Sequence, residues 1–211
     1  MTQVAAPPRR GRWPTPAEWT VLGASLLYIA AAAVAALVVR NREFLLYIVV
    51  MLILVTVVVL VHLRVGFSLG LLWALSGWGL LHMAGGLVPV PATWPIEGRA
   101  RVLYNLWLIP GRLKFDQAVH VYGFGVATWA CWQALRAAAG VERPTAGLVV
   151  LCAAAGVGFG ALNEVIEFVA TRLVAETNVG GYENTGWDLV ANLVGATAAG
   201  LLLWLRGRQG G

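Results

Sequence analysis

An asparagine and two glutamates interrupt a long apolar segment in the last third of the chain, at Asn163, Glu164 and Glu167. Charged side chains inside a segment of membrane-spanning length are costly to desolvate, so they usually face other helices and mark functional sites. Asp188 and Asn192 open a later apolar segment, and their spacing of four residues puts both on one face of a helix. We therefore expect these side chains to bind a cation or to exchange protons.

A second pair with the same spacing, Asp116 and His120, opens an earlier apolar segment. Imidazole together with carboxylates suits a transition metal such as Zn or Mn, whereas carboxylates with asparagine oxygens suit Mg or Ca. A metal ion held there would polarise a phosphoryl or carbonyl oxygen and activate water, which is the chemistry of a hydrolase or a transferase.

The predicted site combines these pairs with one further histidine. A divalent metal ion is the expected cofactor, and its candidate ligands are His82, Asp116, His120, Glu164, Glu167 and Asp188. All of these except His82 are also candidate catalytic residues, and the candidate substrate-binding residues are Asn163, Asn184 and Asn192. Carboxylates this close together cannot all stay ionised alone, because desolvation and their like charges disfavour the charged form. Besides bound cations, the open alternatives are shared protons, protonated His82 and His120, or the nearby Arg112, Lys114 and Arg172.

The composition places these residues in a bilayer. Of 211 residues, 59% are apolar and only 12% are charged, against about a quarter charged in soluble domains. The net charge of +5 comes from basic residues that stand singly or in small groups between apolar runs. That pattern fits loop charges at a membrane surface, and it argues against binding to nucleic acid.

The apolar runs predict an all-α polytopic membrane bundle of about six transmembrane helices in a single domain. The expected spans are residues 19–39, 44–61, 67–87, 116–135, 145–173 and 187–205. Residues 1–18 form a basic tail rich in Pro and Arg, residues 19–205 form the helical domain, and residues 206–211 form a C-terminal tail. Within the long connection after the third span, residues 99–109 are expected to form either a short amphipathic helix on the membrane surface or a partly ordered loop.

The arginines of the tail favour a cytoplasmic location for both termini. In an alternating bundle, the end of the third span, the start of the fourth, the end of the fifth and the start of the sixth lie at one membrane face. The candidate site residues within the spans then share one depth zone, in the exterior half of the membrane: His82, Asp116, His120, Asn163, Glu164, Glu167, Asp188 and Asn192.

Three motifs carry a family resemblance. They are Phe115-Asp116-xxx-His120, Asn163-Glu164-xx-Glu167 and Asn184-Thr185-Gly186-Trp187-Asp188-xxx-Asn192-xx-Gly195-Ala196. Together they resemble the YjdF-type bacterial inner-membrane proteins over residues 80–203 and, more distantly, the VanZ-like proteins. The resemblance implies a bacterial inner-membrane location and a link to the cell envelope. The positions that it carries over are Asp116, His120, Glu164, Glu167, Asp188 and Asn192.

Three classes of function follow. The first is an enzyme or binding protein whose site takes a cation, a lipid head group or an envelope precursor; the second is a small proton- or cation-coupled transporter; and the third is a structural membrane partner. The sequence contains no H-E-x-x-H motif, and no inverted repeat of the kind found in transporters is visible. Membrane lipids are the expected partners, and the oligomeric state is not indicated.

Overall fold

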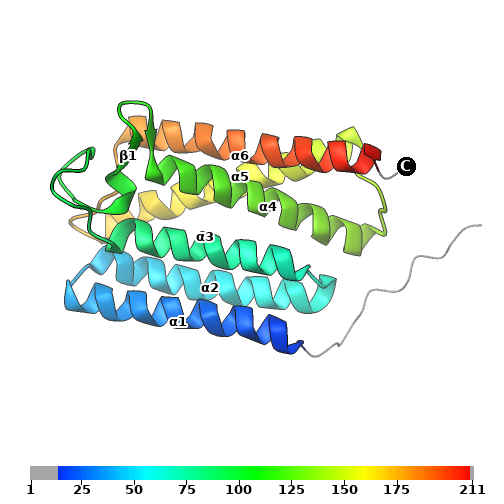
Figure 1. The fold of residues 1–211 in the computed structure, drawn as a ribbon, viewed down its shortest axis with the longest axis horizontal. Coiled ribbons are helices and arrows are strands. Elements are labelled where there is room, and N and C mark those ends of the chain that lie inside the picture. The colour runs from blue at the N-terminus through cyan, green and yellow to red at the C-terminus, as the bar shows by residue number, and fades with distance from the viewer. Residues whose placement is uncertain (1–13, 210–211) are drawn as a thin grey trace, which may run out of the picture.

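The computed structural model describes residues 14–209, and most of this part of the chain is helical (Figure 1). Its six α-helices are α1 (Pro16–Val38), α2 (Arg42–Val65), α3 (Leu69–Leu87), α4 (Phe115–Ala139), α5 (Ala146–Leu173) and α6 (Tyr182–Gln209). Successive helices run in opposite directions, so the loops alternate between the two ends of the bundle (Figure 1). The all-α bundle is confirmed.

Polar capping residues fix where the apolar runs become helices. Thr15 and Glu18 form a reciprocal capping box at the start of α1, and Asn41, Ser68 and Thr145 each accept a hydrogen bond from the backbone N–H three residues further on, at the starts of α2, α3 and α5. Such side chains satisfy N–H groups that the first helical turn leaves without partners. The caps therefore define the helix starts more closely than hydropathy does.

Three helix ends differ from the predicted ones. The tail was expected to reach residue 18, but α1 begins at Pro16; residues 1–13 lie outside the described part. The sixth helix begins at Tyr182 rather than at Trp187, and it continues to Gln209, into the predicted C-terminal tail. The early start of α6 has a local cause, because the Asn184 side chain accepts a hydrogen bond from Lys114 and donates one to Asp188 one turn later.

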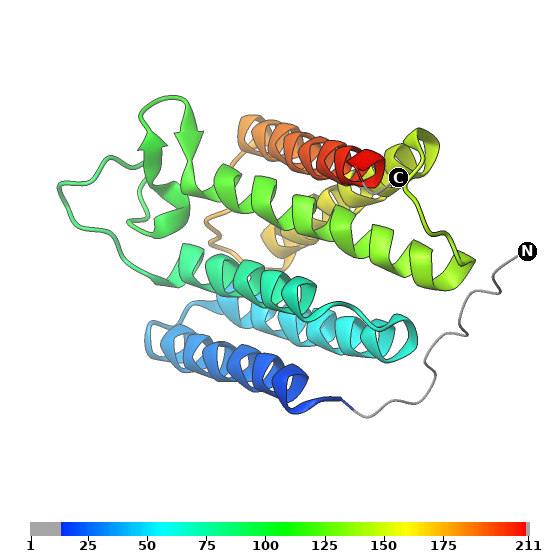
Figure 2. The same cartoon turned by 45° about the vertical axis from the view of Figure 1, so that its right-hand side comes forward.

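The helices pack as two groups of three. α4, α5 and α6 contact one another, as do α1 with α2 and α3, and α3 joins the groups through its contact with α4 (Figures 1 and 2). α4 and α6 approach closely because Gly195 of α6 lies against the backbone of Val121, where a Cβ atom would collide with the carbonyl oxygen. This approach brings the first turns of α4 and α6 together.

The outer surface of the bundle is apolar. Large hydrophobic side chains are exposed on its helices, for example Leu27, Val38 and Phe168. Four helices, α1, α2, α5 and α6, are long and apolar enough to cross a membrane. α3 and α4 are not among these four, so the expected six spans are not confirmed, although α3 and α4 run alongside the others (Figure 1).

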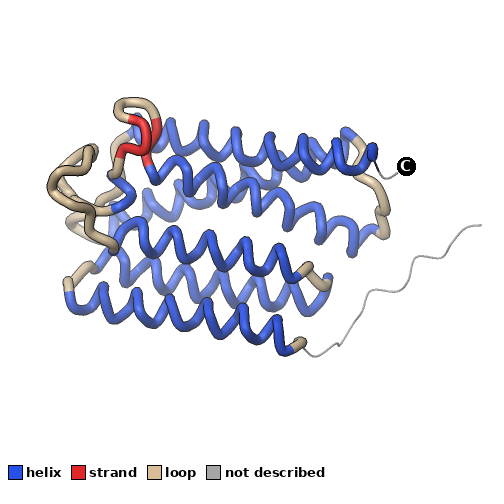
Figure 3. The backbone as a smooth tube through the Cα atoms, viewed as in Figure 1, coloured by secondary structure: helices blue, strands red, loops and turns tan. Residues whose placement is uncertain are grey.

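An ordered segment, residues 88–114, joins α3 to α4 and covers one end of the bundle; we call it the cap (Figure 3). It contains a short 3₁₀ helix, η1 (Leu103–Asn105), and an antiparallel hairpin of β1 (Trp107–Ile109) and β2 (Leu113–Lys114). Of the two alternatives for residues 99–109, the amphipathic helix was therefore wrong. Isolated antiparallel β-bridges join Pro89 to Val102 and Ile96 to Leu106. They occupy backbone N–H and C=O groups that a helix would pair internally.

Candidate functional site

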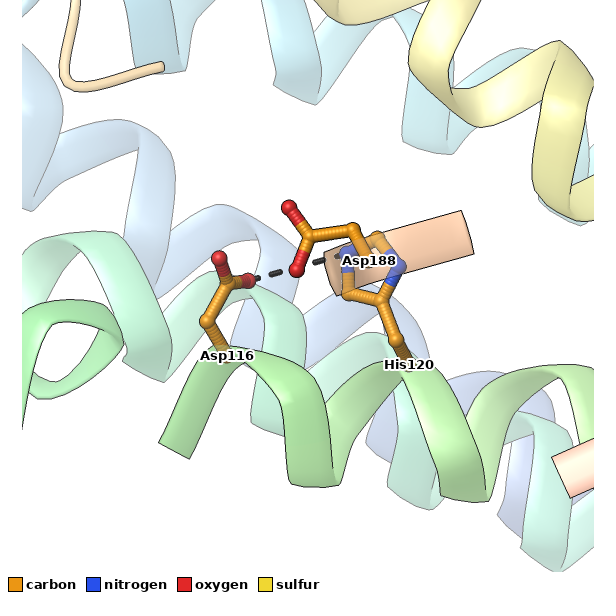
Figure 4. A group of neighbouring side chains, drawn as sticks. All are labelled: Asp116, His120 and Asp188. Atoms are coloured by element: carbon orange, nitrogen blue, oxygen red, sulfur yellow. Dashed lines mark ion pairs between the residues drawn. The ribbon is translucent and has the colours of Figure 1, made fainter. Parts of the chain in front are cut away.

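His120 lies at the centre of a buried polar cluster beneath the cap. It belongs to the second turn of α4, and only 3% of its surface is exposed. Nε2 lies 3.6 Å from Oδ1 of Asp116, one turn earlier on the same helix, and Figure 4 shows Asp188 of α6 beside the pair. One imidazole thus faces carboxylates from two helices.

Asn192 of α6 orients the His120 ring. Its Oδ1 lies 2.9 Å from Nδ1 of His120. Because an amide oxygen can only accept, Nδ1 carries a proton and donates it. In the neutral imidazole, the lone pair of Nε2 then lies on the side of Asp116. Metal-binding histidines are usually held in this way by a hydrogen bond from the other ring nitrogen.

α5 adds two glutamates to the cluster. Oε1 of Glu164 lies 3.6 Å from Nδ1 of His120, and the side chain is 8% exposed. Neither of its carboxylate oxygens accepts a hydrogen bond of ordinary length within the described part of the chain, although the side-chain amides of Asn163 and Asn192 lie near enough to interact with it. Glu167 is half-buried, and its Oε1 accepts a hydrogen bond of 2.8 Å from Nδ2 of Asn163. Glu164 is therefore the member of the cluster whose oxygens lack donors.

Asp188 of α6 is fully buried. Its Oδ2 accepts a hydrogen bond of 2.5 Å from Nδ2 of Asn184, whereas Oδ1 has no partner among the described residues. Asn184 in turn accepts from the ammonium of Lys114, which also pairs with Glu97 at 2.8 Å. This relay links the cap to the cluster and brings one positive charge near it.

The cluster contains two groups of atoms spaced as metal ligands. Among the described residues, one atom each from Asp116, His120 and Asp188 lies within 4.8 Å of the others, and the same holds for His120, Glu164 and Glu167. Two ligands about 2.1 Å from one zinc ion at a tetrahedral angle lie about 3.4 Å apart. The 3.6 Å between Nε2 and Oδ1 is near this spacing and too long for a good hydrogen bond.

Close packing of α5 and α6 fixes these positions. A Cβ atom on Gly160 of α5 would lie 2.6 Å from Nδ2 of Asn192, so the absence of a side chain there gives Asn192 its place. Nδ2 of Asn192 is itself buried without a partner in the described structure. Polar groups that are buried without partners are rare in proteins and call for an explanation.

A cavity of about 860 Å³ lies between the cap and the cluster; we call it the polar cavity. Asp116 and Glu167 line it, whereas His120, Glu164 and Asp188 lie behind them. Lys114 and Arg112 of the cap contribute positive charge to its wall. A ligand in this cavity would therefore meet the outer carboxylates of the cluster first.

His82 lies apart from both ligand groups. Its Nδ1 is 2.5 Å from the hydroxyl of Tyr104 in η1, and both residues line the polar cavity. Burial raises the pKa of the Tyr104 phenol well above its usual value, so the phenol keeps its proton and donates it to Nδ1. Sequence reasoning missed Tyr104, because nothing in a loop sequence predicts which helix the loop will contact.

Two asparagines fasten the cap to the opposite loop. The side chains of Asn105 in η1 and Asn178, in the loop after α5, donate to each other's oxygens at 2.9 and 3.3 Å. The backbone N–H of Asn178 also donates to Glu43 of α2 at 2.8 Å. These contacts hold the cap over the polar cavity from two sides.

The structure thus brings together the cluster predicted from sequence: Asp116, His120, Glu164, Glu167 and Asp188. Each predicted substrate-binding asparagine hydrogen-bonds a member of this cluster, Asn163 to Glu167, Asn184 to Asp188 and Asn192 to His120. Their expected contact with a substrate stays a prediction, as does the role of His82 as a metal ligand.

Comparison with known proteins gives one match. The family described as predicted membrane protein (DUF2238) matches residues 20–209, nearly the whole chain. No curated protein and no solved structure matches the chain significantly. The more distant similarity to VanZ-like proteins is not shown by these comparisons and stays a prediction. The match covers all six helices and every residue of the cluster, and the chain therefore belongs to the DUF2238, YjdF-type family of predicted membrane proteins.

Proposed function

We propose that the cluster around His120 binds a divalent metal ion and presents it to a polar head group in the polar cavity. The observation that carries this proposal is the set of buried oxygens without hydrogen-bond donors, both of Glu164 and one of Asp188, around a histidine whose ring is held through Nδ1 by Asn192. Buried carboxylates are paired or bind metals, because an isolated buried charge is very costly. A cation supplies what these oxygens lack.

The ligand chemistry favours a transition metal. Nε2 of His120 with carboxylate oxygens of Asp116 and Asp188 is a mixed nitrogen and oxygen set, which suits Zn or Mn better than Mg or Ca. Glu164 and Glu167 form the adjoining group and would balance the charge of the ion or hold a proton. Asn192, Asn184 and Asn163 would orient the ligands from behind.

The polar cavity would take a negatively charged head group together with a metal ion. Its wall carries two cations, Arg112 and Lys114, against five acids, Glu43, Glu97, Asp116, Glu167 and Glu183. Bound metal would therefore supply much of the positive charge that a phosphate needs. Bound metal would polarise a phosphoryl or carbonyl oxygen and favour attack by water or another acceptor. We therefore assign the site to hydrolysis or transfer at the head group of a lipid or envelope precursor.

In the bilayer, we place all six helices across the membrane. α3 and α4, with 19 and 25 residues, are long enough to span it. Their less apolar side chains, such as Ser76, His82 and Gln133, would be shielded by neighbouring helices. With the basic tail inside, the cap and the polar cavity face the exterior of a bacterial inner membrane.

A second candidate, proton exchange, is favoured by one contact pair. Each ring nitrogen of His120 faces a carboxylate at 3.6 Å, Nε2 facing Asp116 and Nδ1 facing Glu164. A proton taken up at one nitrogen and released at the other would cross from one carboxylate to the other without a metal. Such a relay would suit a proton-coupled transporter.

Elemental analysis of detergent-purified protein separates the two candidates. We expect about one equivalent of Zn or Mn per chain in the wild type and at least a tenfold loss in Asp116→Asn and Asp188→Asn. Glu176→Gln, which changes an exposed acid at the same end of the bundle, is the control and should keep the metal. The well-folded wild type is also incubated with Zn²⁺ and Mn²⁺, and the excess is removed. A metal content below a tenth of an equivalent after this treatment would contradict the metal proposal and favour the proton relay.

A further inference from the structure

The polar cavity continues into the membrane-spanning part of the bundle. A narrow cavity of about 30 Å³ shares three lining residues with it: Tyr47, His82 and Glu167. On its other side, the narrow cavity shares Met51, Leu54 and Trp78 with a third cavity, of about 490 Å³, which we call the apolar cavity. The shared walls place the three cavities next to one another along α2 and α3, with α5 forming part of the wall of the narrow cavity.

The chemistry of the walls changes along this series. The apolar cavity lies between α1, α2 and α3, and its wall is mostly aliphatic, with Val55, Val58, Leu72 and Leu75 among its residues. Its two serines, Ser25 and Ser76, are hydrogen-bonded to each other at 2.8 Å, so they do not call for water. Glu18 and His62, which also belong to the wall, lie 3.6 Å from each other. The aliphatic part of the wall suits an apolar ligand. Its volume is within the range of about 300 to 1,000 Å³ that is usual for small-molecule sites.

The apolar cavity also reaches the outer surface of the bundle. Trp19 of α1 and Leu63 of α2 belong to its wall and are 53% and 40% exposed. The surface around them is apolar, with Leu27 and Leu60 exposed on the same two helices. A hydrocarbon chain in the surrounding bilayer would therefore reach the cavity past Trp19 and Leu63.

We propose that the apolar cavity holds a hydrocarbon chain of a membrane lipid whose head group lies in the polar cavity, beside Glu167 and Asp116. The head-group half of this inference rests on the proposed function, whereas the chain half rests only on the cavities. Each part of the ligand meets matching walls: aliphatic residues for the chain, and Lys114 and Arg112 with the acidic cluster for the head.

The narrow cavity sets the selectivity. Its volume of about 30 Å³, against about 490 and 860 Å³ for its two neighbours, makes it the constriction between them, and we expect it to pass at most one hydrocarbon chain. The substrate class is therefore a lipid with one chain threaded between α2 and α3. Any further chain would stay in the bilayer.

The test uses two photoreactive phosphatidic acids in vesicles of phosphatidylcholine containing the full-length protein. One carries a diazirine at the middle of its chain and the other carries it next to the glycerol, and labelled residues are identified by mass spectrometry after irradiation. We expect the mid-chain probe to label the walls of the apolar cavity, such as Val55 and Val58. The probe labelled near the glycerol should mark the narrow cavity at Met51 and Leu54.

Substitutions that fill the cavity give the matched comparison. Leu54→Trp fills the junction of the narrow and apolar cavities, and Leu52→Trp puts the same bulk on a side chain that is 43% exposed on the same helix. Labelling inside the apolar cavity should fall at least fivefold in Leu54→Trp and stay unchanged in Leu52→Trp. Val58→Trp, which fills only the apolar cavity, repeats the test at a second position should Leu54→Trp fail to fold.

Two results would overturn the inference: labels confined to outward-facing residues in the wild type, or cavity labelling that is equal in all variants. Metal analysis of the same samples keeps the proposals apart. Labelled cavities without metal would remove the proposed metal chemistry and leave the chain site standing. Metal without cavity labelling would do the reverse.

Discussion

Asn192 Oδ1 lies 2.9 Å from His120 Nδ1, although the two residues are 72 positions apart in the chain. This contact decides which nitrogen of the imidazole carries the proton, and it fixes the plane of the ring between the carboxylates of three helices. The chemistry of the site therefore depends on a residue that would not itself bind the metal.

Replacing this asparagine tests that dependence. Asn192→Leu keeps the approximate volume and removes the acceptor, so Nδ1 loses its partner and the free ring nitrogen is no longer specified. We expect the affinity for Zn²⁺ to fall about 10- to 100-fold, measured by competition with a chromophoric chelator. Gln133→Leu, at the opposite end of α4, is the control; equal affinities in both variants would rule out an orienting role.

Packing between α4 and α6 gives a second prediction. Gly195→Ala puts a Cβ atom against the backbone oxygen of Val121, which cannot rotate away. We expect a loss of stability of about 1 to 3 kcal/mol, the usual cost of overpacking, seen as a lower unfolding midpoint in detergent. Gly158→Ala is the matched control on α5, because its Cβ atom would meet nothing within 4 Å. If both variants unfold at the same midpoint, α4 and α6 have room to separate and the prediction is wrong.

The fastening of the cap can be measured by hydrogen exchange. Asn105→Ala removes both side-chain hydrogen bonds to Asn178, each worth about 0.5 to 1.5 kcal/mol. Backbone amides in residues 102–107 should then exchange roughly tenfold faster, or more, while helix interiors stay unchanged. Arg99→Ala changes an exposed side chain of the same cap and should have no such effect. Slow exchange in both variants would place the main anchor elsewhere.

The proposed orientation predicts which loops are reachable from outside the cell. In a background with Cys131→Ala and Cys152→Ala, Arg112→Cys in the cap should react with a membrane-impermeant maleimide in intact cells. Glu142→Cys, in the loop between α4 and α5 at the other end, should react only after the membrane is opened. The reverse labelling pattern would indicate the opposite membrane topology, with the polar cavity facing the cytoplasm.

Local features of the sequence predict much of this structure. Runs of apolar residues predicted all six helices, because a helix that crosses a hydrocarbon core needs about 20 predominantly apolar residues in succession. The spacing of Asp116 with His120 and of Asp188 with Asn192, together with the alternation of helix direction, predicted that they would meet. The start of α6 could not be predicted from hydropathy, because its first turn, from Tyr182 to Thr185, is polar and is held through Asn184 by the distant Lys114.

What could not be predicted depends on contacts between distant residues. The cap lacks a regular period, so neither its hairpin nor the contact of Tyr104 with His82 leaves a pattern in the sequence. The lack of donors around Glu164 is likewise a property of three packed helices rather than of its neighbours along the chain. Nor does any single segment predict a series of cavities whose walls come from several helices.

The anchoring of the cap also sets an order for biosynthesis. The cap leaves the ribosome before α5 and α6, yet its partners Asn178 and Asn184 follow Asn105 and Lys114 by 73 and 70 positions. Until those residues emerge, Lys114 has no amide to donate to and η1 has no loop to bind. The polar end of the bundle therefore completes only after the last helix has been inserted, so a nascent chain truncated before α6 would expose an open, unassembled site to the insertion machinery.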